Sequence, residues 1–224
     1  MKEKSQIKKE RVLQTASRLI TRYGFEKTTM EDIARESGVS KGALYLLWPG
    51  KDELFENLLT YEMTRLLADF TARMQNDPQG GQIGPLFRHA LLALHDNPLI
   101  CDLYTQDNRV LGDFVKRQDP GRYISRVLLG ESSMRQMQAA NLLRSDLRPE
   151  VLAYLFSLIS VGFIYIGTIL PSEHQPPLEE LITAMTEMVQ NGLAGSGEKS
   201  TAGKEAMQTM TEFVLQQYKE KESK

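Results

Sequence analysis

A stretch between residues 28 and 51 combines hydroxyl groups, ammonium groups and a phenol at close spacing. These groups belong to Thr28, Thr29, Ser40, Lys41, Tyr45 and Lys51. Hydroxyls and free backbone amides at the start of a helix bind phosphate, because those amides have no partner inside the helix. A lysine can reach a phosphate or the edge of a guanine. The chemistry that this stretch favours is recognition of nucleic acid rather than catalysis.

Two short helices separated by a glycine are predicted to position these side chains. Thr28 and Thr29 can each cap a first helix, and each has an acidic residue three positions later, which is the spacing of a capping box. Gly38 stands where that helix should end, and Ser40 can cap a second helix over residues 41–47. A helix, a glycine turn and a second helix form the helix-turn-helix plan, whose second helix lies in the major groove of DNA.

The residues around this motif form an ordered pattern that continues on both sides of it. Its positions are Val12, Leu13, Ala16, Leu19, Ile20, Tyr23, Gly24, Phe25, Thr28, Thr29, Asp32, Ile33, Ala34, Gly38, Val39, Ser40, Lys41, Gly42, Leu44, Tyr45, Trp48, Lys51 and Leu54. The pattern resembles the DNA-binding domain of the TetR family of bacterial transcriptional regulators and covers roughly the first quarter of the chain. The resemblance implies an all-α fold: a three-helix helix-turn-helix DNA-binding domain, followed by a helical domain for ligand binding and dimerisation.

The same resemblance implies which residues touch double-stranded operator DNA. The expected contacts are Thr28, Thr29, Ser40, Lys41, Gly42, Ala43, Tyr45, Leu46 and Lys51. Tyr45 and Lys51 are expected to bind phosphates, and Ala43 is placed to touch a thymine methyl. Such a protein binds a palindromic operator as a homodimer.

Leu46 and Leu47 depart from the family pattern, in which a polar or aromatic residue often faces DNA. Apolar side chains make no hydrogen bonds with base edges. Specificity is therefore expected to depend on Lys41, on DNA shape or on the basic start of the first helix.

Charge is distributed unevenly along the 224 residues. Residues 1–51 hold 11 basic and 6 acidic side chains, whereas the remainder holds 16 and 23. A basic beginning on an acidic body is typical of a chain that presents one end to nucleic acid. We therefore divide the chain into a DNA-binding domain (1–51, with the helix-turn-helix at about 29–48), a helical regulatory and dimerisation domain (52–194), and a linker with an extra amphipathic helix (195–224).

Further helices are predicted throughout the chain, with breaks at proline and glycine clusters. The expected ranges are 5–23, 51–75, 85–96, 99–117, 123–143, 149–170, 178–192 and 203–221, with a flexible linker at 195–203. The last helix has one apolar face, which predicts that it docks, most simply on the chain's own body. Cys101 is the only cysteine, so no intramolecular disulfide forms, and the charged N-terminus lacks a secretory core. A cytoplasmic location is expected.

Residues 151–170 contain no charge and are long enough to span a bilayer. Serines, glycines and tyrosines interrupt this stretch, and basic flanks are missing. A helix buried against a partner subunit has the same appearance. By resemblance, the helices at about 149–170 and 178–192 pair with those of a second copy, and no membrane contact is expected.

The body is expected to hold a small-molecule effector whose binding releases a repressor from DNA. Candidate contacts are His89, Tyr104, Arg109, Tyr123 and Tyr154. Two alternatives remain open, namely a body that binds a protein partner instead, and a membrane-anchored helical protein. No metal-ligand spacing, phosphate loop or nucleophile motif is present, so neither an enzyme nor a metal or cofactor site is expected.

Overall fold

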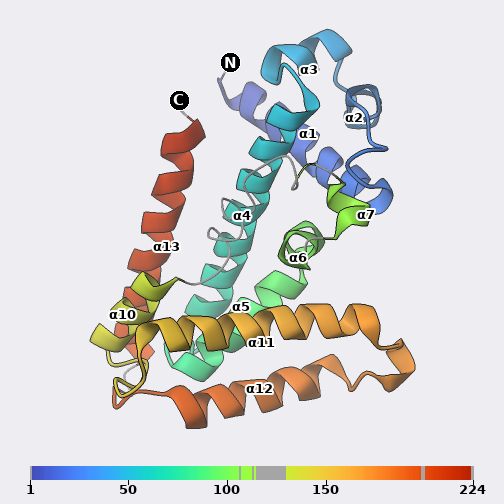
Figure 1. Ribbon diagram of the computed structural model, residues 1–224. Coiled ribbons are helices and arrows are strands. Elements are labelled where there is room, and N and C mark those ends of the chain that lie inside the picture. The colour runs from blue at the N-terminus through green and yellow to red at the C-terminus, as the bar shows by residue number, and fades with distance from the viewer. Residues whose placement is uncertain (1, 106, 113, 115–129, 198–199, 223–224) are drawn as a thin grey trace. The chain divides into compact units, whose positions relative to one another are not determined.

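The computed structural model describes residues 2–105, 107–112, 114, 130–197 and 200–222 (Figure 1). Regular structure in these ranges is helical, apart from one isolated bridge between Leu143 and Ala194, so the predicted all-α class is confirmed. The helices are α1 (Lys2–Tyr23), α2 (Met30–Ser37), α3 (Lys41–Leu47), α4 (Lys51–Asn76), α5 (Ile83–His95), α6 (Pro98–Thr105), α7 (Asn108–Leu111), α10 (Glu131–Ala139), α11 (Pro149–Ile169), the short 3-10 helix η1 (Ser172–His174), α12 (Leu178–Leu193) and α13 (Ser200–Glu222).

The chain divides into two compact units, and the division falls within α4. The first unit takes the described residues of 1–64 and 97–123, and the second takes those of 65–96 and 124–224. The unit that contains α2 and α3 is thus larger than residues 1–51, because it includes the first half of α4 together with α6 and α7. The functional boundary at residue 51 stays a prediction.

An aromatic cluster forms the centre of the first unit. The ring centroid of Phe25 lies 4.8 Å from that of Phe55 in α4 and 5.2 Å from that of Phe114, and all three side chains are fully buried. The amide of Phe25 also donates a hydrogen bond to the carbonyl of Val110 (2.6 Å). Tilted ring pairs at these distances stabilise a core beyond the area that they bury. The segment after α6 therefore completes the core on which α1 to α3 rest.

The predicted helix at 99–117 is wrong, because the structure breaks it after Thr105. The amide of Asp107 donates a hydrogen bond to the carbonyl of Asp102, five residues earlier. The amide of Leu111 donates one to the carbonyl of Asp107, which starts the separate helix α7. Gly112 follows with φ +57°, a conformation that ends a helix and that glycine adopts at little cost.

The predicted helix at 123–143 is only partly tested, because residues 123–129 lie outside the described ranges. Its described part, α10, ends at Ala139 and not at Leu143. Asn141 adopts φ +56°, and the amide of Leu142 bonds the carbonyl of Met137, which turns the chain away from the helix axis.

The second unit has its own core between α4, α5 and α10 to α13. Buried side chains from all six helices and from the loop after α10 form one cluster: Phe70, Met74, Ile83, Leu86, Phe87, Leu91, Ala93, Met134, Met137, Leu142, Leu143, Leu152, Phe156, Val189 and Met207. Gly84 lets α5 approach α12 closely, and its amide bonds the side chain of Gln190 (2.9 Å). α11 and α12 run in opposite directions on either side of η1 (Figure 1).

The segment expected to be a flexible linker is held in place at its start, which corrects that prediction. The amides of Gly195 and Gly197 bond the carbonyls of Leu142 and Asn141, at 3.0 and 3.1 Å. A side chain at Gly195 would overlap the backbone of this same loop, so the close approach requires glycine here. The glycine-rich composition predicted mobility, whereas a tertiary contact fixes these residues.

α13 packs on its own unit, which is the interpretation favoured from the sequence. Met207 and Thr211 are buried, and the ammonium of Lys204 donates to the carbonyl of Gln75 at the end of α4 (3.1 Å). Gly203 lies so close to the carbonyl of Gly81 that a side chain there would overlap it. These contacts dock one face of α13 against the body.

Candidate nucleic-acid interface

The start of α2 is fixed by a reciprocal cap at Thr29. The hydroxyl oxygen of Thr29 accepts a hydrogen bond from the amide of Asp32 (3.1 Å), and the Asp32 carboxylate accepts one from the amide of Thr29 (3.2 Å). This is the capping box that the sequence predicts, realised at the second of the two threonines. The Thr29 hydroxyl also donates to Asp32 (2.6 Å), and Thr29 itself is exposed.

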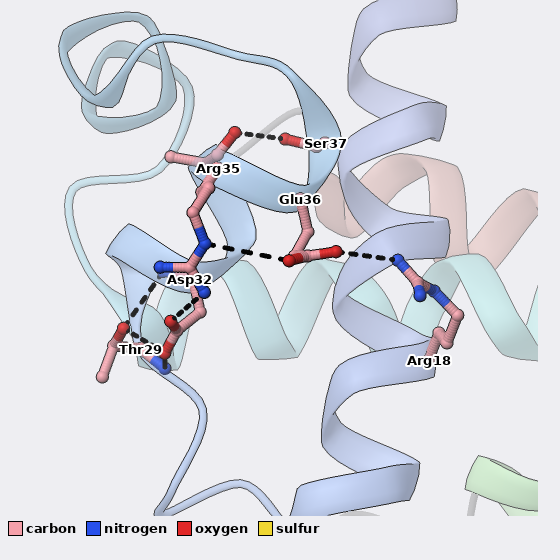
Figure 2. Close-up of polar contacts among 7 residues, drawn as sticks. Arg18, Thr29, Asp32, Arg35, Glu36 and Ser37 are labelled. Carbon is pink, nitrogen blue, oxygen red and sulfur yellow. Dashed lines mark hydrogen bonds and ion pairs between the residues drawn. The ribbon is translucent and has the colours of Figure 1, made fainter.

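A chain of polar contacts joins this cap to α1. Figure 2 shows Asp32 bound by the guanidinium of Arg35 (2.7 Å), with Glu36 between Arg35 and Arg18. Hydrogen bonds from Thr29 first, and then from Arg35, hold the pKa of the Asp32 carboxyl below its ordinary value. Both arginines are largely exposed, so these pairs contribute little stability. They orient two cations on the outer surface of α1 and α2.

Thr28, in contrast, points into the unit. Its side chain is buried, and its hydroxyl donates to the carbonyl of Gly24 (2.9 Å). Thr28 therefore closes the turn between α1 and α2. Its hydroxyl is not available in this structure for the phosphate contact that the sequence predicts.

The turn between α2 and α3 follows the predicted chemistry. Gly38 adopts φ +65°, and the amide of Val39 bonds the carbonyl of Ala34 (3.0 Å), which satisfies the last turn of α2. Val39 is buried beneath the turn. The hydroxyl oxygen of Ser40 accepts a hydrogen bond from the amide of Ala43 (3.4 Å) and so caps α3.

The two faces of α3 differ sharply. Leu44 and the C-cap residue Trp48 are buried in the unit and anchor the helix. The other face carries predicted contact residues, of which Lys41, Gly42, Tyr45 and Leu46 are exposed and Ala43 is half-buried. Leu47, which was not among the predicted contacts, is also half-buried. Six of the predicted contacts, namely Ser40, Lys41, Gly42, Ala43, Tyr45 and Leu46, thus lie together on one short helix and its cap.

Lys41 is held at the surface by Glu31, the acidic residue that the sequence analysis placed in a capping box with Thr28. Its ammonium pairs with the carboxylate of Glu31 on α2 and lies 5.8 Å from the ring centroid of Tyr45. The hydrogen bond with Glu31 raises the pKa of the Lys41 ammonium, and the same bond lowers the pKa of the Glu31 carboxyl. The pairing depends on the turn that brings α2 and α3 together, so no local sequence pattern indicates it.

Lys51 has an internal partner. Its ammonium donates to the carbonyl of Phe25 (2.8 Å) and lies 4.2 Å from the centroid of the Phe25 ring. The side chain is half-buried at the start of α4. Lys51 thus ties α4 to the loop before α2, and its contact with a DNA phosphate stays a prediction.

The five predicted effector contacts are spread over both units. In the second unit, His89 Nε2 lies 2.8 Å from the Asp77 carboxylate, whereas Tyr154 on α11 is 68% exposed. In the first unit, Tyr104 is half-buried on α6, and Arg109 belongs to α7. Tyr123 lies outside the described residues. A common pocket for these residues stays a prediction, and no group of three or more metal-ligating side chains occurs in the described ranges.

An apolar surface lies on α11, α12 and the turn between them. Its exposed side chains are Tyr154, Leu158, Tyr165, Ile166, Ile169, Leu170, Leu178 and Met188. Within the described part of the chain, α11 is the single helix that is long and apolar enough to cross a membrane, a test that core helices of soluble proteins also pass. Only 11% of its most apolar window is buried, and an exposed apolar surface of this kind is typical of an interaction site.

Comparison with known proteins relates the helix-turn-helix unit to regulators. Residues 12–58 match the profile described as "Bacterial regulatory proteins, tetR family". The HTH-type transcriptional regulator YuxN of Bacillus subtilis is 30% identical over 99 residues, which are 44% of this chain and 32% of YuxN. The nucleoid occlusion factor SlmA of Haemophilus influenzae is 41% identical over 56 residues, which are 25% of this chain and 26% of SlmA. The match thus spans about a third or less of the length of these curated relatives.

Solved structures share the fold over most of the chain. A TetR family transcription regulator from Marinobacter aquaeolei superposes with a TM-score of 0.58 at 13% identity, covering 87% of this chain and all of that one. The transcriptional regulator FadR of Bacillus subtilis, in complex with stearoyl-CoA, superposes with a TM-score of 0.60 at 12% identity, covering 82% of this chain and 98% of that one. At these identities the likeness shows the fold alone.

Proposed function

We propose that the chain, whose residues 12–58 match the tetR family profile, is a sequence-specific DNA-binding transcriptional regulator of that family. The observation that carries the proposal is the exposed face of α3. A recognition helix must rest on a core and leave its other face free for the major groove. Here Leu44 and Trp48 supply the anchor, while Lys41 and Tyr45 are exposed beside it.

The contacts divide into those that position the protein and those that read bases. The exposed start of α2 at Thr29 binds one phosphate, and the Tyr45 hydroxyl binds another. Lys41 exchanges Glu31 for a phosphate or a guanine edge when DNA arrives. Gly42 has open space around its Cα, so it lets the helix backbone approach the bases.

The exposed surface of α11 and α12 supports a homodimer, through helices at about 149–170 and 178–192. Two copies related by a two-fold axis present two α3 helices to one duplex. Half-sites of a palindrome are then read roughly 34–36 Å apart, one turn of DNA. Burial of aromatic and branched apolar side chains supplies the driving force for the pairing. In such a cytoplasmic dimer the apolar surface of α11 and α12 is covered by the second copy rather than by a membrane.

The body responds to a small effector, and the response is release of a repressor from its operator. The solved structure of FadR holds stearoyl-CoA within a similar fold, which supports a ligand of this general size. The effector must bind the DNA-incompetent state more tightly, with a coupling of about 1–3 kcal/mol. A body that recruits a protein through α13 is less favoured, because one face of α13 already packs on its own unit.

Fluorescence anisotropy tests the proposal with a labelled duplex from the region upstream of the chain's own gene and a scrambled duplex, each at two salt concentrations. We expect tighter, salt-dependent binding to the upstream duplex. Lys41→Ala should lower the slope of log K against log salt by about 0.9 if Lys41 replaces Glu31 with a phosphate. Arg135→Ala, which removes an exposed cation of the second unit, serves as the control and should leave the slope unchanged. Equal binding to both duplexes would count against an operator in that region.

A further inference from the structure

The exposed face of α3 contains a patch without hydrogen-bonding side chains. It consists of Gly42, Ala43, Leu46 and Leu47. Leu46 is 88% exposed, the highest value among the exposed large hydrophobic side chains of the described residues. An exposed leucine on its own is ordinary, but this one stands in the last turn of a helix that the proposed function places against DNA.

Helix geometry makes these residues one continuous surface. Leu46 lies one turn after Gly42 and Ala43, and helical side chains lean toward the N-terminus, over the residues three and four positions earlier. Gly42 has no side chain, and the space around it is open. Leu46 therefore projects over a shallow, uncharged strip of the helix.

The polar groups beside this strip are largely engaged within the unit. The hydroxyl oxygen of Ser40 accepts a hydrogen bond from the amide of Ala43 and caps α3, and the ammonium of Lys41 forms an ion pair with Glu31. Tyr45 and Lys41 lie one turn apart, and their phenol and ammonium suit the phosphates along the groove edge. The strip formed by Gly42, Ala43, Leu46 and Leu47 is left to contact bases without side-chain hydrogen bonds.

Only one base offers such a surface a matching partner. The major-groove edges of guanine, cytosine and adenine present hydrogen-bond donors and acceptors, whereas thymine adds a C5 methyl group. Leucine against a donor or acceptor removes water from that group and returns no hydrogen bond, which costs binding free energy. Leucine against a methyl buries apolar area on both sides.

We propose that Leu46 is a specificity-determining residue that reads the C5 methyl of thymine in the major groove. This inference rests on the proposed function, because it assigns the base chemistry read by the same helix. Each operator half-site then carries a thymine opposite Leu46, and the methyl group, rather than a hydrogen-bond pattern, distinguishes that position.

The test uses the duplex that the wild-type protein selects from a randomised pool. Each thymine of a half-site is replaced in turn by deoxyuridine, which removes only the methyl group. At one position the wild type should lose about fourfold in affinity per methyl removed, as expected for burial of one such group. Leu46→Ala should bind the thymine and uracil duplexes equally at that position, whereas Leu46→Met, which keeps an apolar reach, should retain a preference for thymine.

A second arm separates the methyl group from other properties of the base pair. The thymine pair is replaced by a cytosine–guanine pair with or without a C5 methyl on the cytosine. The wild type should bind the methylated pair about fourfold more tightly, and Leu46→Ala should not distinguish the two. Because Leu46 is exposed, Leu46→Ala should unfold at the same denaturant concentration as the wild type.

The outcomes distinguish failure of the inference from failure of the function. If the wild type enriches no sequence from the pool, the proposed function fails and the inference falls with it. If it enriches a sequence but binds every uracil-substituted duplex as tightly as the thymine duplex, only the inference is overturned. The same conclusion follows if Leu46→Ala retains the full sensitivity to uracil.

Discussion

Replacing Lys51 with methionine separates a role in holding the fold from a role in binding DNA. Methionine keeps most of the apolar stem but removes the ammonium that bonds the Phe25 carbonyl and lies over the Phe25 ring. A hydrogen bond from a charged group contributes about 1.5–3 kcal/mol, and a partly exposed cation over an aromatic ring about 0.5–1 kcal/mol. Because Lys51 is only half-buried, we add the lower limits of these two ranges. Lys51→Met should therefore lower the free energy of unfolding by about 2 kcal/mol.

The chain offers a direct reporter of this loss. Trp48 is the only tryptophan and is buried in the unit that contains Lys51, so its fluorescence follows unfolding of that unit. With a urea m-value of about 2 kcal/mol/M, the midpoint of Lys51→Met should fall by about 1 M. Lys27→Met provides the control, since Lys27 is exposed, and should change stability by less than about 0.5 kcal/mol.

DNA binding supplies the result that would refute this reasoning. If Lys51 serves the fold, the salt dependence of operator binding should be the same for Lys51→Met and the wild type under conditions in which both are folded. If the urea midpoint of Lys51→Met is unchanged and the slope of log K against log salt concentration is reduced by about 0.9, Lys51 is instead a phosphate contact.

Three other changes test separate parts of the structure. Leu44→Ala removes a fully buried side chain and should lower the free energy of unfolding, measured in urea, by about 2–5 kcal/mol. Asp32→Asn should be less stable than the wild type at neutral pH; because the Thr29 hydrogen bond lowers the folded pKa of Asp32, the difference should vanish as pH falls below the ordinary value of 3.8 and through the folded pKa. Gly203→Ala forces a side chain against a backbone carbonyl and should expose α13 to limited proteolysis, whereas Gly192→Ala, which meets open space, should not.

Local chemistry accounts for the parts of the interface that were predicted. The capping pattern before α2, the glycine at its end and the serine before α3 each act within four residues, so the sequence carries their full signal. The exposed side of α3 follows from the same spacing, because Leu44 and Trp48 must both face the core.

The features that could not be predicted depend on residues brought together by the fold. The inward bond of Lys51 requires a carbonyl 26 positions earlier, and the partner of Lys41 lies across a turn. The start of the supposed linker is held by the loop around Asn141. The break after α6 comes from backbone hydrogen bonds at Asp107, and no proline or glycine between Pro98 and that residue signals it.

Selection from a randomised duplex pool by the purified chain tests the central claim most directly, because the operator need not be known in advance. The account predicts enrichment of one palindromic sequence whose half-site centres lie one turn of DNA apart, and loss of that enrichment when Lys41 and Tyr45 are both replaced by alanine. A pool that stays as random after selection as before would contradict the claim that α3 reads DNA sequence.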